Sequence, residues 1–126
     1  MALQERTRDR VPGGWANTQY NLGLALLKIG WRERTALYFE EAVIAFRDAL
    51  KEYTRERMPL QWADAQNNLA NALTTLARFE TGAAKLDAAV AAYRKALAVF
   101  QSAGSVNAGH IQKNLEVAER LLRERR

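Results

Sequence analysis

Apolar residues recur every three or four positions along five stretches of the chain, which is the spacing of amphipathic helices. We expect helices over about residues 15–29, 33–53, 60–78, 82–101 and 107–123. Pro12 and Pro59 stand near two of these starts, where proline is favoured, and Gly30 predicts the end of the first helix. Residues 102–105 (Ser-Ala-Gly-Ser) form the clearest break. The pattern predicts an all-α fold.

The same pattern occurs twice at an offset of 47 residues, so that residues 11–50 match residues 58–97. The matched positions include Asn21 with Asn68, Leu22 with Leu69, and Phe46 with Tyr93. A shorter third copy places Gln112, Asn114 and Leu115 where the second copy has Gln66, Asn68 and Leu69. Internal repeats of this length predict a solenoid of stacked helical hairpins.

The repeat also predicts the domain organisation. We expect a single domain over residues 1–126, with a remnant of a preceding repeat at 1–10, repeats at 11–57 and 58–104, and a capping helix at 105–126. Residues 2–10 match residues 49–57, which is the reason for the expected remnant. We therefore expect the array to continue upstream of Met1.

Two matching sets of small and aromatic residues resemble the tetratricopeptide repeat family. They are Gly23, Ala42, Phe46 and Ala49 in one copy, and Ala70, Ala89, Tyr93 and Ala96 in the other. The resemblance implies a right-handed α-α superhelix of two full helical hairpins, with a capping helix after them and a remnant of a helix before them. The period exceeds the family's usual length of about 34 residues, and is more similar to the long-helix repeats of kinesin light chain, a variant familiar in bacterial proteins. HEAT and armadillo repeats remain an alternative.

In tetratricopeptide proteins the first helices of successive repeats line a concave groove that holds a peptide of a partner. Helical spacing gives each of the three first helices here a polar, asparagine-rich face. The residues expected to bind a peptide are Asn17, Tyr20, Asn21, Leu24, Lys28, Asp64, Asn67, Asn68, Asn71, His110, Lys113, Asn114 and Arg120. Leu27 is expected on this face, and the opposite, packed face is expected to hold Ala16, Leu22, Gly23, Leu26 and Ile29.

Asn21, Asn68 and Asn114 recur at one place in each unit and resemble the asparagine ladder of kinesin-light-chain repeats. An asparagine amide offers both a donor and an acceptor to a peptide backbone. Three such hydrogen bonds, each worth about 1 kcal/mol, predict binding in roughly the micromolar range unless side-chain pockets add to it. The alternative is that these amides bond to neighbouring helices and fix the stacking.

Composition excludes several classes of function. The chain has no cysteine, which excludes disulfides and thiolate metal sites and fits the reducing cytoplasm, where we expect the protein. No apolar run approaches the roughly 20 residues of a membrane-spanning helix, so we expect no membrane contact. The net charge is +5, which suits an acidic partner, although solvated helix ends explain such charges equally. Arginines gather at the two ends, as Arg6, Arg8 and Arg10 and as Arg120, Arg123, Arg125 and Arg126.

The sequence carries no recognisable catalytic pattern. His110 is the only histidine, and no metal-ligand, phosphate-loop or nucleophile motif accompanies it. We therefore expect no enzymatic activity, no cofactor and no metal, with His110 at the surface. Trp15 and Trp62 share a repeat position and are expected to pack at helix starts, whereas Trp31 has no counterpart and is expected to be exposed.

These features predict a non-catalytic scaffold that binds a protein or peptide partner in its groove. Self-association through exposed repeat ends is the alternative, because two and a half repeats are near the minimum for stability. A minor alternative is nucleic-acid binding through the arginine-rich ends, which would depend strongly on salt.

Overall fold

The computed structural model describes residues 12–125. They form five helices, α2 (Pro12–Glu33), α3 (Ala36–Ala49), α4 (Pro59–Ala77), α5 (Ala84–Ser102) and α6 (Asn107–Glu124). No strand occurs among these residues, so the all-α prediction is confirmed for this part of the chain. The remnant expected at residues 1–10 lies outside the described residues.

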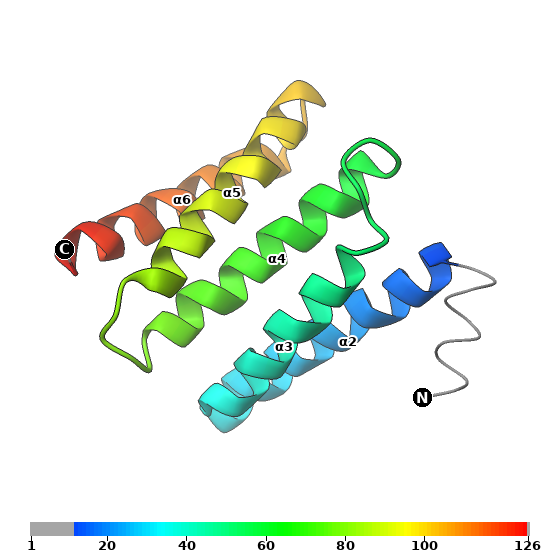
Figure 1. Ribbon diagram of the computed structural model, residues 1–126. Coiled ribbons are helices and arrows are strands. Elements are labelled where there is room, and N and C mark those ends of the chain that lie inside the picture. Colours follow the sequence, from blue (N-terminus) through cyan, green and yellow to red (C-terminus); the bar gives the residue numbers. More distant parts are fainter. Residues whose placement is uncertain (1–11, 126) are drawn as a thin grey trace.

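The helices follow one another side by side in the order of the sequence (Figure 1). Each helix packs against the helices before and after it, and α2 and α6 also touch α4. In Figure 1, α3 and α5 lie in front of α2 and α6. The three first helices of the predicted units, α2, α4 and α6, are therefore brought next to one another.

Aromatic side chains fill the space within the first hairpin, where glycines let α2 and α3 approach closely. Phe46 is fully buried, and a Cβ added to Gly23 would lie 2.6 Å from the Cε1 atom of its ring. A Cβ on Gly30 would lie 2.9 Å from the Cζ atom of Phe39. Both separations are too short for real side-chain contacts, so α2 needs glycine at these two positions.

The predicted end of the first helix at Gly30 is wrong, because this glycine serves the close approach of α2 and α3. Gly30 does not stop α2, which continues to Glu33. The chain turns instead at Arg34, whose φ of 53° lies in the left-handed region and whose backbone N–H donates to the Gly30 carbonyl at 2.8 Å. Gly30 is therefore explained by its contact with Phe39, and a non-glycine residue supplies the left-handed turn.

The second helix is shorter than predicted, because α3 ends at Ala49 and not near Tyr53. Tyr53 nevertheless stays buried, at 1% exposure, in the loop before α4. It packs with Ala16, Ala49 and Ala65 in a small second cluster beside the main core. Its hydroxyl donates to the side-chain oxygen of Asn17. An apolar spacing that looked helical thus continues into a loop.

The assignment of helix faces is correct for most of α2, with two exceptions. Leu22, expected on the packed face, is 47% exposed, because no helix among residues 12–125 packs on that side of α2. Leu27, expected on the groove face, is only 3% exposed and joins the main core.

Within the described residues, no helix is long and apolar enough to cross a membrane.

Candidate functional site

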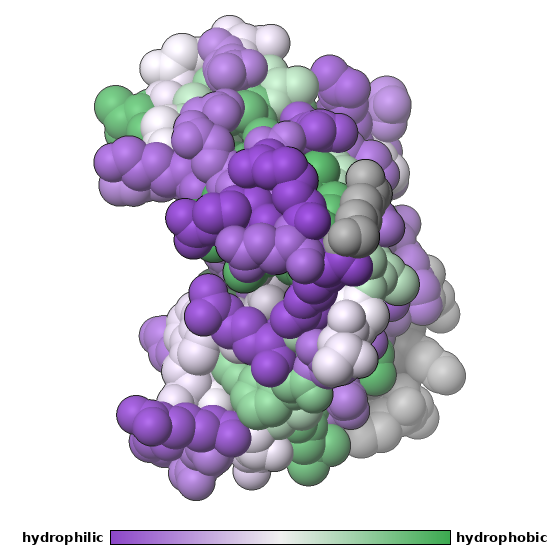
Figure 2. Space-filling view, turned by 90° about the vertical axis from the view of Figure 1, so that its left-hand side faces the viewer, coloured by the Kyte–Doolittle hydropathy of each residue, from purple (hydrophilic) through white to green (hydrophobic). Residues whose placement is uncertain are grey.

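The three first helices enclose a hollow on one side of the molecule. It is a cavity of about 440 Å³ with walls from α2, α4 and α6 and a floor that reaches α5. Figure 2, which looks onto the left-hand end of Figure 1, shows the outline hollowed between an upper and a lower part. The lining residues are Trp31, Asn71, Thr74, Thr75, Arg78, Tyr93, Asn114 and Val117.

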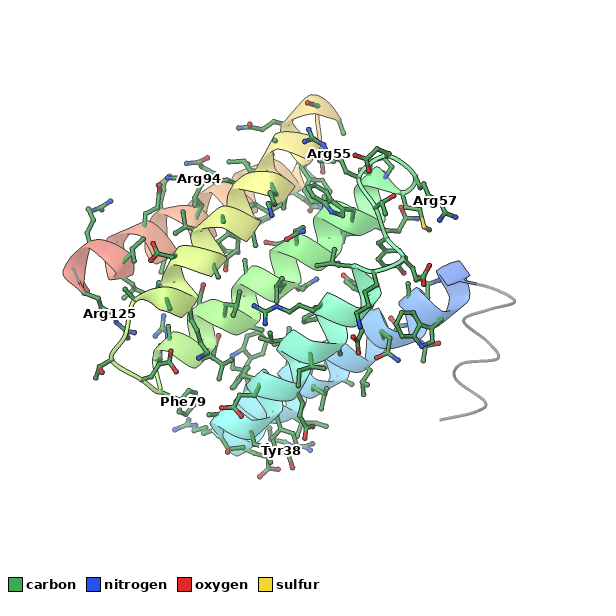
Figure 3. All side chains as sticks on the ribbon, viewed as in Figure 1. Tyr38, Arg55, Arg57, Phe79, Arg94 and Arg125 are labelled. Carbon is green, nitrogen blue, oxygen red and sulfur yellow. The ribbon has the colours of Figure 1, made fainter. Side chains whose placement is uncertain are left out.

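A second cavity of about 700 Å³ continues from the first toward the α2–α3 turn, and the two share Trp31, Thr75 and Arg78 as lining residues. Its apolar wall is a row of rings. The centroids of Trp31 and Phe39 are 6.0 Å apart in an edge-to-face contact, and those of Phe39 and Phe79 are 6.2 Å apart. Figure 3 shows Phe79 at the same end of the molecule as Tyr38, near the start of α3.

Two guanidinium groups give this second cavity a positive charge. Arg34 and Arg78 both line it. No ion pair or side-chain hydrogen bond joins either guanidinium to another residue in the described range 12–125. Arg78 caps the C-terminal end of α4 and Arg34 follows α2, positions where the helix dipole favours a cation. The site can therefore accept a carboxylate without first breaking an internal salt bridge.

The predicted amide residues of α4 are largely engaged by tyrosines. The side-chain nitrogen of Asn68 donates to the hydroxyl of Tyr20 on α2 at 2.8 Å. The hydroxyl of Tyr93 on α5 donates to the side-chain oxygen of Asn71 at 2.5 Å. For Asn68 this is the arrangement expected of an amide that fixes the stacking of helices. Asn71 keeps its amide nitrogen for a further partner, since among the described residues only its side-chain oxygen is engaged.

Burial changes the acidity of the groups around Tyr20. Burial, together with the negative charge of Asp64, raises the pKa of Tyr20 to about 12, and the hydrogen bond from Asn68 opposes part of this change. Burial also raises the pKa of Asp64 above its usual value of 3.8. The pKa of Tyr53 is raised in the same way, by burial and by the charge of Asp64. Tyr20 on α2 therefore forms a half-buried polar contact with Asp64 and Asn68 on α4, and this contact has a structural role.

The remaining predicted residues fall into three groups. Asn114 lines the cavity, and the side-chain oxygen of Asn67 is buried with no donor among the described residues, a condition that a ligand or an ordered water satisfies. Leu24 is half-buried and packs against the core. The others are exposed and line neither cavity, namely Asn21, Lys28, His110, Lys113 and Arg120.

The sequence prediction missed the positive and aromatic end of the hollow. Arg34, Arg78 and Phe79 lie at or just beyond the ends of α2 and α4, where helical spacing does not assign a residue to the groove face. Trp31 was expected to be exposed, and it is, at 54%. A useful signal was its lack of a repeat counterpart, since residues that depart from a repeat are free to serve a ligand.

Two of the tryptophans and the C-terminal arginines that the sequence pointed to lie at helix ends or on the surface of α6. Trp15 is buried at the start of α2, and the guanidinium carbon of Arg55 lies 5.8 Å from the ring centroid of the half-buried Trp62. Of the C-terminal arginines, Arg120 and Arg123 are exposed on α6, while Arg125 donates to the Gly82 carbonyl at 3.0 Å. Figure 3 shows Arg125 beside the α4–α5 turn.

Comparisons of the chain with family models, with curated proteins and with solved structures find no match. Among residues 12–125, no group of three or more histidine, aspartate or glutamate side chains is placed to hold a metal ion. The candidate site is therefore defined by the hollow and by the side chains that line it.

Proposed function

We propose that this chain is a tetratricopeptide-like right-handed solenoid and acts as a non-catalytic scaffold in the cytoplasm, holding an extended peptide of a protein partner along α2, α4 and α6. One observation carries the proposal. Two connected cavities run across these helices, and they combine an exposed tryptophan, side-chain amides and two guanidinium groups that have no side-chain partner within residues 12–125. The second cavity, with its aromatic wall and a few convergent polar groups, has the character of a typical binding pocket.

The positive charge and the aromatic rings of the cavities determine which peptide side chains fit the site. Arg34 and Arg78 suit a carboxylate side chain, because hydrogen bonds between ionised partners are stronger than neutral ones. The neighbouring rings of Trp31 and Phe79 suit an apolar side chain close to it. The partner segment is therefore acidic and apolar in alternation, with its backbone within reach of the amides of Asn71 and Asn114.

A direct test uses a short fluorescent peptide that alternates glutamate and leucine, with a matched peptide that alternates lysine and leucine. We expect the acidic peptide to bind in roughly the micromolar range and the basic one to bind much more weakly. Arg78→Gln removes one charged donor and is expected to weaken binding about tenfold.

The matched control is Arg47→Gln, because Arg47 is an exposed arginine on α3 that lines neither cavity. Its substitution changes the net charge by the same amount and leaves affinity nearly unchanged. Equal losses of affinity in the two variants would mean that binding depends only on general charge attraction. Equal binding of the acidic and the basic peptide would contradict the proposed site.

The resemblance to kinesin-light-chain repeats adds a ladder of Asn21, Asn68 and Asn114 to this proposal. Since Asn68 already donates to Tyr20, we assign backbone binding to Asn114 and Asn71. Asn114→Ala is expected to lower peptide affinity without lowering the melting temperature. A fall in melting temperature with unchanged affinity would instead give Asn114 a stacking role.

A further inference from the structure

One face of α4 carries a row of polar side chains that begins inside the two cavities and continues beyond them. Asn71, Thr75 and Arg78 line the cavities. Asp64 and Asn68 continue the same row toward the start of α4, because steps of three and four residues return to one face of a helix. This row, which we call the α4 row, therefore has a carboxylate at one end and a guanidinium group at the other, with neutral side chains between them.

The carboxylate of Asp64 has no counter-ion within residues 12–125. Asp64 is half-buried near Tyr20 and Tyr53, and its negative charge contributes to the raised pKa of both tyrosines. No salt bridge in this part of the chain includes Asp64. Figure 3 shows Arg55 and Arg57 near the start of α4, and neither forms an ion pair with Asp64. A charge that is partly withdrawn from water costs free energy unless it is paired, so a cation from a ligand would stabilise this end of the row.

The helix fixes the distance between the two charged ends of the α4 row. Asp64 and Arg78 are 14 residues apart on α4, and a rise of about 1.5 Å per residue separates their α-carbons by about 21 Å. An extended peptide advances about 3.3 Å per residue, so about six residues span this distance. Between the two ends, Asn71 offers its amide nitrogen to the peptide backbone, since only its side-chain oxygen is engaged among the described residues.

We propose that the peptide bound in the groove carries one cationic side chain in an otherwise acidic and apolar segment, with the cation at Asp64 and a carboxylate at Arg78, about six residues apart. This inference rests on the proposed function, because it requires a peptide that lies along α4.

The surroundings of Asp64 suit the ammonium group of a lysine, which has three N–H donors. One donor reaches the carboxylate, and hydrogen bonds between ionised partners are stronger than neutral ones. Another can reach the hydroxyl oxygen of Tyr20, which has two lone pairs and accepts one N–H from Asn68 at 2.8 Å. The two ends of the α4 row therefore select opposite charges, and the length of the row selects their spacing.

Fluorescent heptapeptides with blocked ends test the inference on the full chain. The parent heptapeptide alternates glutamate and leucine and has glutamate at both ends, so that its terminal side chains are six residues apart. In one pair of peptides the first glutamate is changed to lysine or to glutamine, and in a second pair the last glutamate is changed in the same way. The two pairs cover both directions in which a peptide can lie along α4.

In at least one pair, we expect the lysine peptide to bind about tenfold more tightly than the glutamine peptide. A heptapeptide of the same composition as the lysine peptide, with its lysine moved to the third position, tests the spacing. Its lysine is at most four residues from any glutamate, which spans only about 13 Å. This peptide should bind no more tightly than the glutamine peptide.

Asp64→Asn keeps the shape of the side chain and removes its charge, and it is expected to abolish the preference for lysine over glutamine. The matched control is Asp48→Asn on α3, the same chemical change at a half-buried aspartate that Lys51 already pairs at 2.9 Å. This control should keep the preference. Helical circular dichroism checks that both variants are folded.

The outcomes separate this inference from the proposed function. If the parent peptide binds but lysine gives no gain in either pair, the inference is wrong and the acidic groove stands. A preference for lysine that survives Asp64→Asn, or that Asp48→Asn removes equally, also overturns it. If no heptapeptide binds, the proposed function fails and the inference fails with it.

Discussion

α2 and α4 carry the same sequence pattern 47 residues apart, but they meet different surroundings. α4 lies between α3 and α5 and is covered on two sides, whereas α2 is covered mainly by α3. Leu69 is consequently 7% exposed and its counterpart Leu22 is 47% exposed. The comparison teaches that periodicity assigns a residue to one side of a helix, and that a neighbouring helix decides whether this side is buried.

The largest expected difference in stability is between substitutions of these two leucines. Leu69→Ala removes a buried side chain and is expected to lower the free energy of unfolding by about 2–5 kcal/mol. Leu22→Ala in dilute solution removes a half-exposed one and should cost about 1 kcal/mol or less. Urea denaturation followed by circular dichroism measures both. Similar losses would mean that α2 and α4 are buried alike.

The next effect tests how tightly α2 approaches α3. Gly23→Ala forces a methyl group against the ring of Phe46 and is expected to destabilise the protein by about 1–3 kcal/mol, although alanine is the better helix former. α4 tolerates alanine at the equivalent position, Ala70. Thermal denaturation measures the change.

Gly109→Ala is a suitable control for Gly23→Ala, because a Cβ at this exposed glycine of α6 would meet nothing within 4 Å. It should stabilise the protein by up to about 1 kcal/mol through helix propensity alone. A stabilising Gly23→Ala would show that Phe46 moves aside freely, against the close packing described above.

A smaller effect distinguishes the asparagines of the two repeats. Asn68→Ala removes the donor to the Tyr20 hydroxyl and should lower the free energy of unfolding by about 1–2 kcal/mol. Asn21→Ala, at the equivalent exposed position of α2, should change it by less than about 0.5 kcal/mol. The pair is measured by urea denaturation, and a double variant with Tyr20→Phe should show that the Asn68 and Tyr20 effects are not additive.

The smallest effect concerns pH. Because the pKa of Asp64 is raised in the folded protein, its contribution to stability is fully present below the usual carboxyl pKa and is lost as the pH rises through the raised value. Asp64→Asn is neutral at every pH and should therefore gain stability relative to the natural chain between acidic and neutral pH. Thermal denaturation at both pH values tests this sign, which a pH-independent difference would contradict.

Much of the fold could be predicted from the sequence because it depends on local periodicity. Five helices, the break at residues 102–105 and the proline at the start of α4 follow from spacing and from backbone chemistry. The end of α2 could not, because the contact between Gly30 and Phe39 exists only after α3 folds back. The burial of Tyr53 in a loop likewise depends on Ala16 and Ala65 from other helices.

The candidate site was predictable only in part for a related reason. Asn71 and Asn114 were found because helical spacing puts them on one face, and both line the hollow. Arg34 and Arg78 were missed because they lie at helix ends, where helical periodicity does not indicate which way a side chain points. Asn68 was placed on the correct face, but the tyrosine that engages its amide stands 48 residues away.

Packing between neighbours in sequence also bears on how the chain folds. Since the helices contact mainly those next to them in the chain, native contacts can form without closing long loops, and proteins with such local contacts fold quickly. α4 is the exception in touching each of the other described helices. Its amide protons should exchange most slowly with solvent, and protection should decline toward the first turn of α2 and the last turn of α6. Opening of α4 would divide the core into two hairpins. We therefore expect the described helices to unfold from α2 and α6 inward, with α4 opening last.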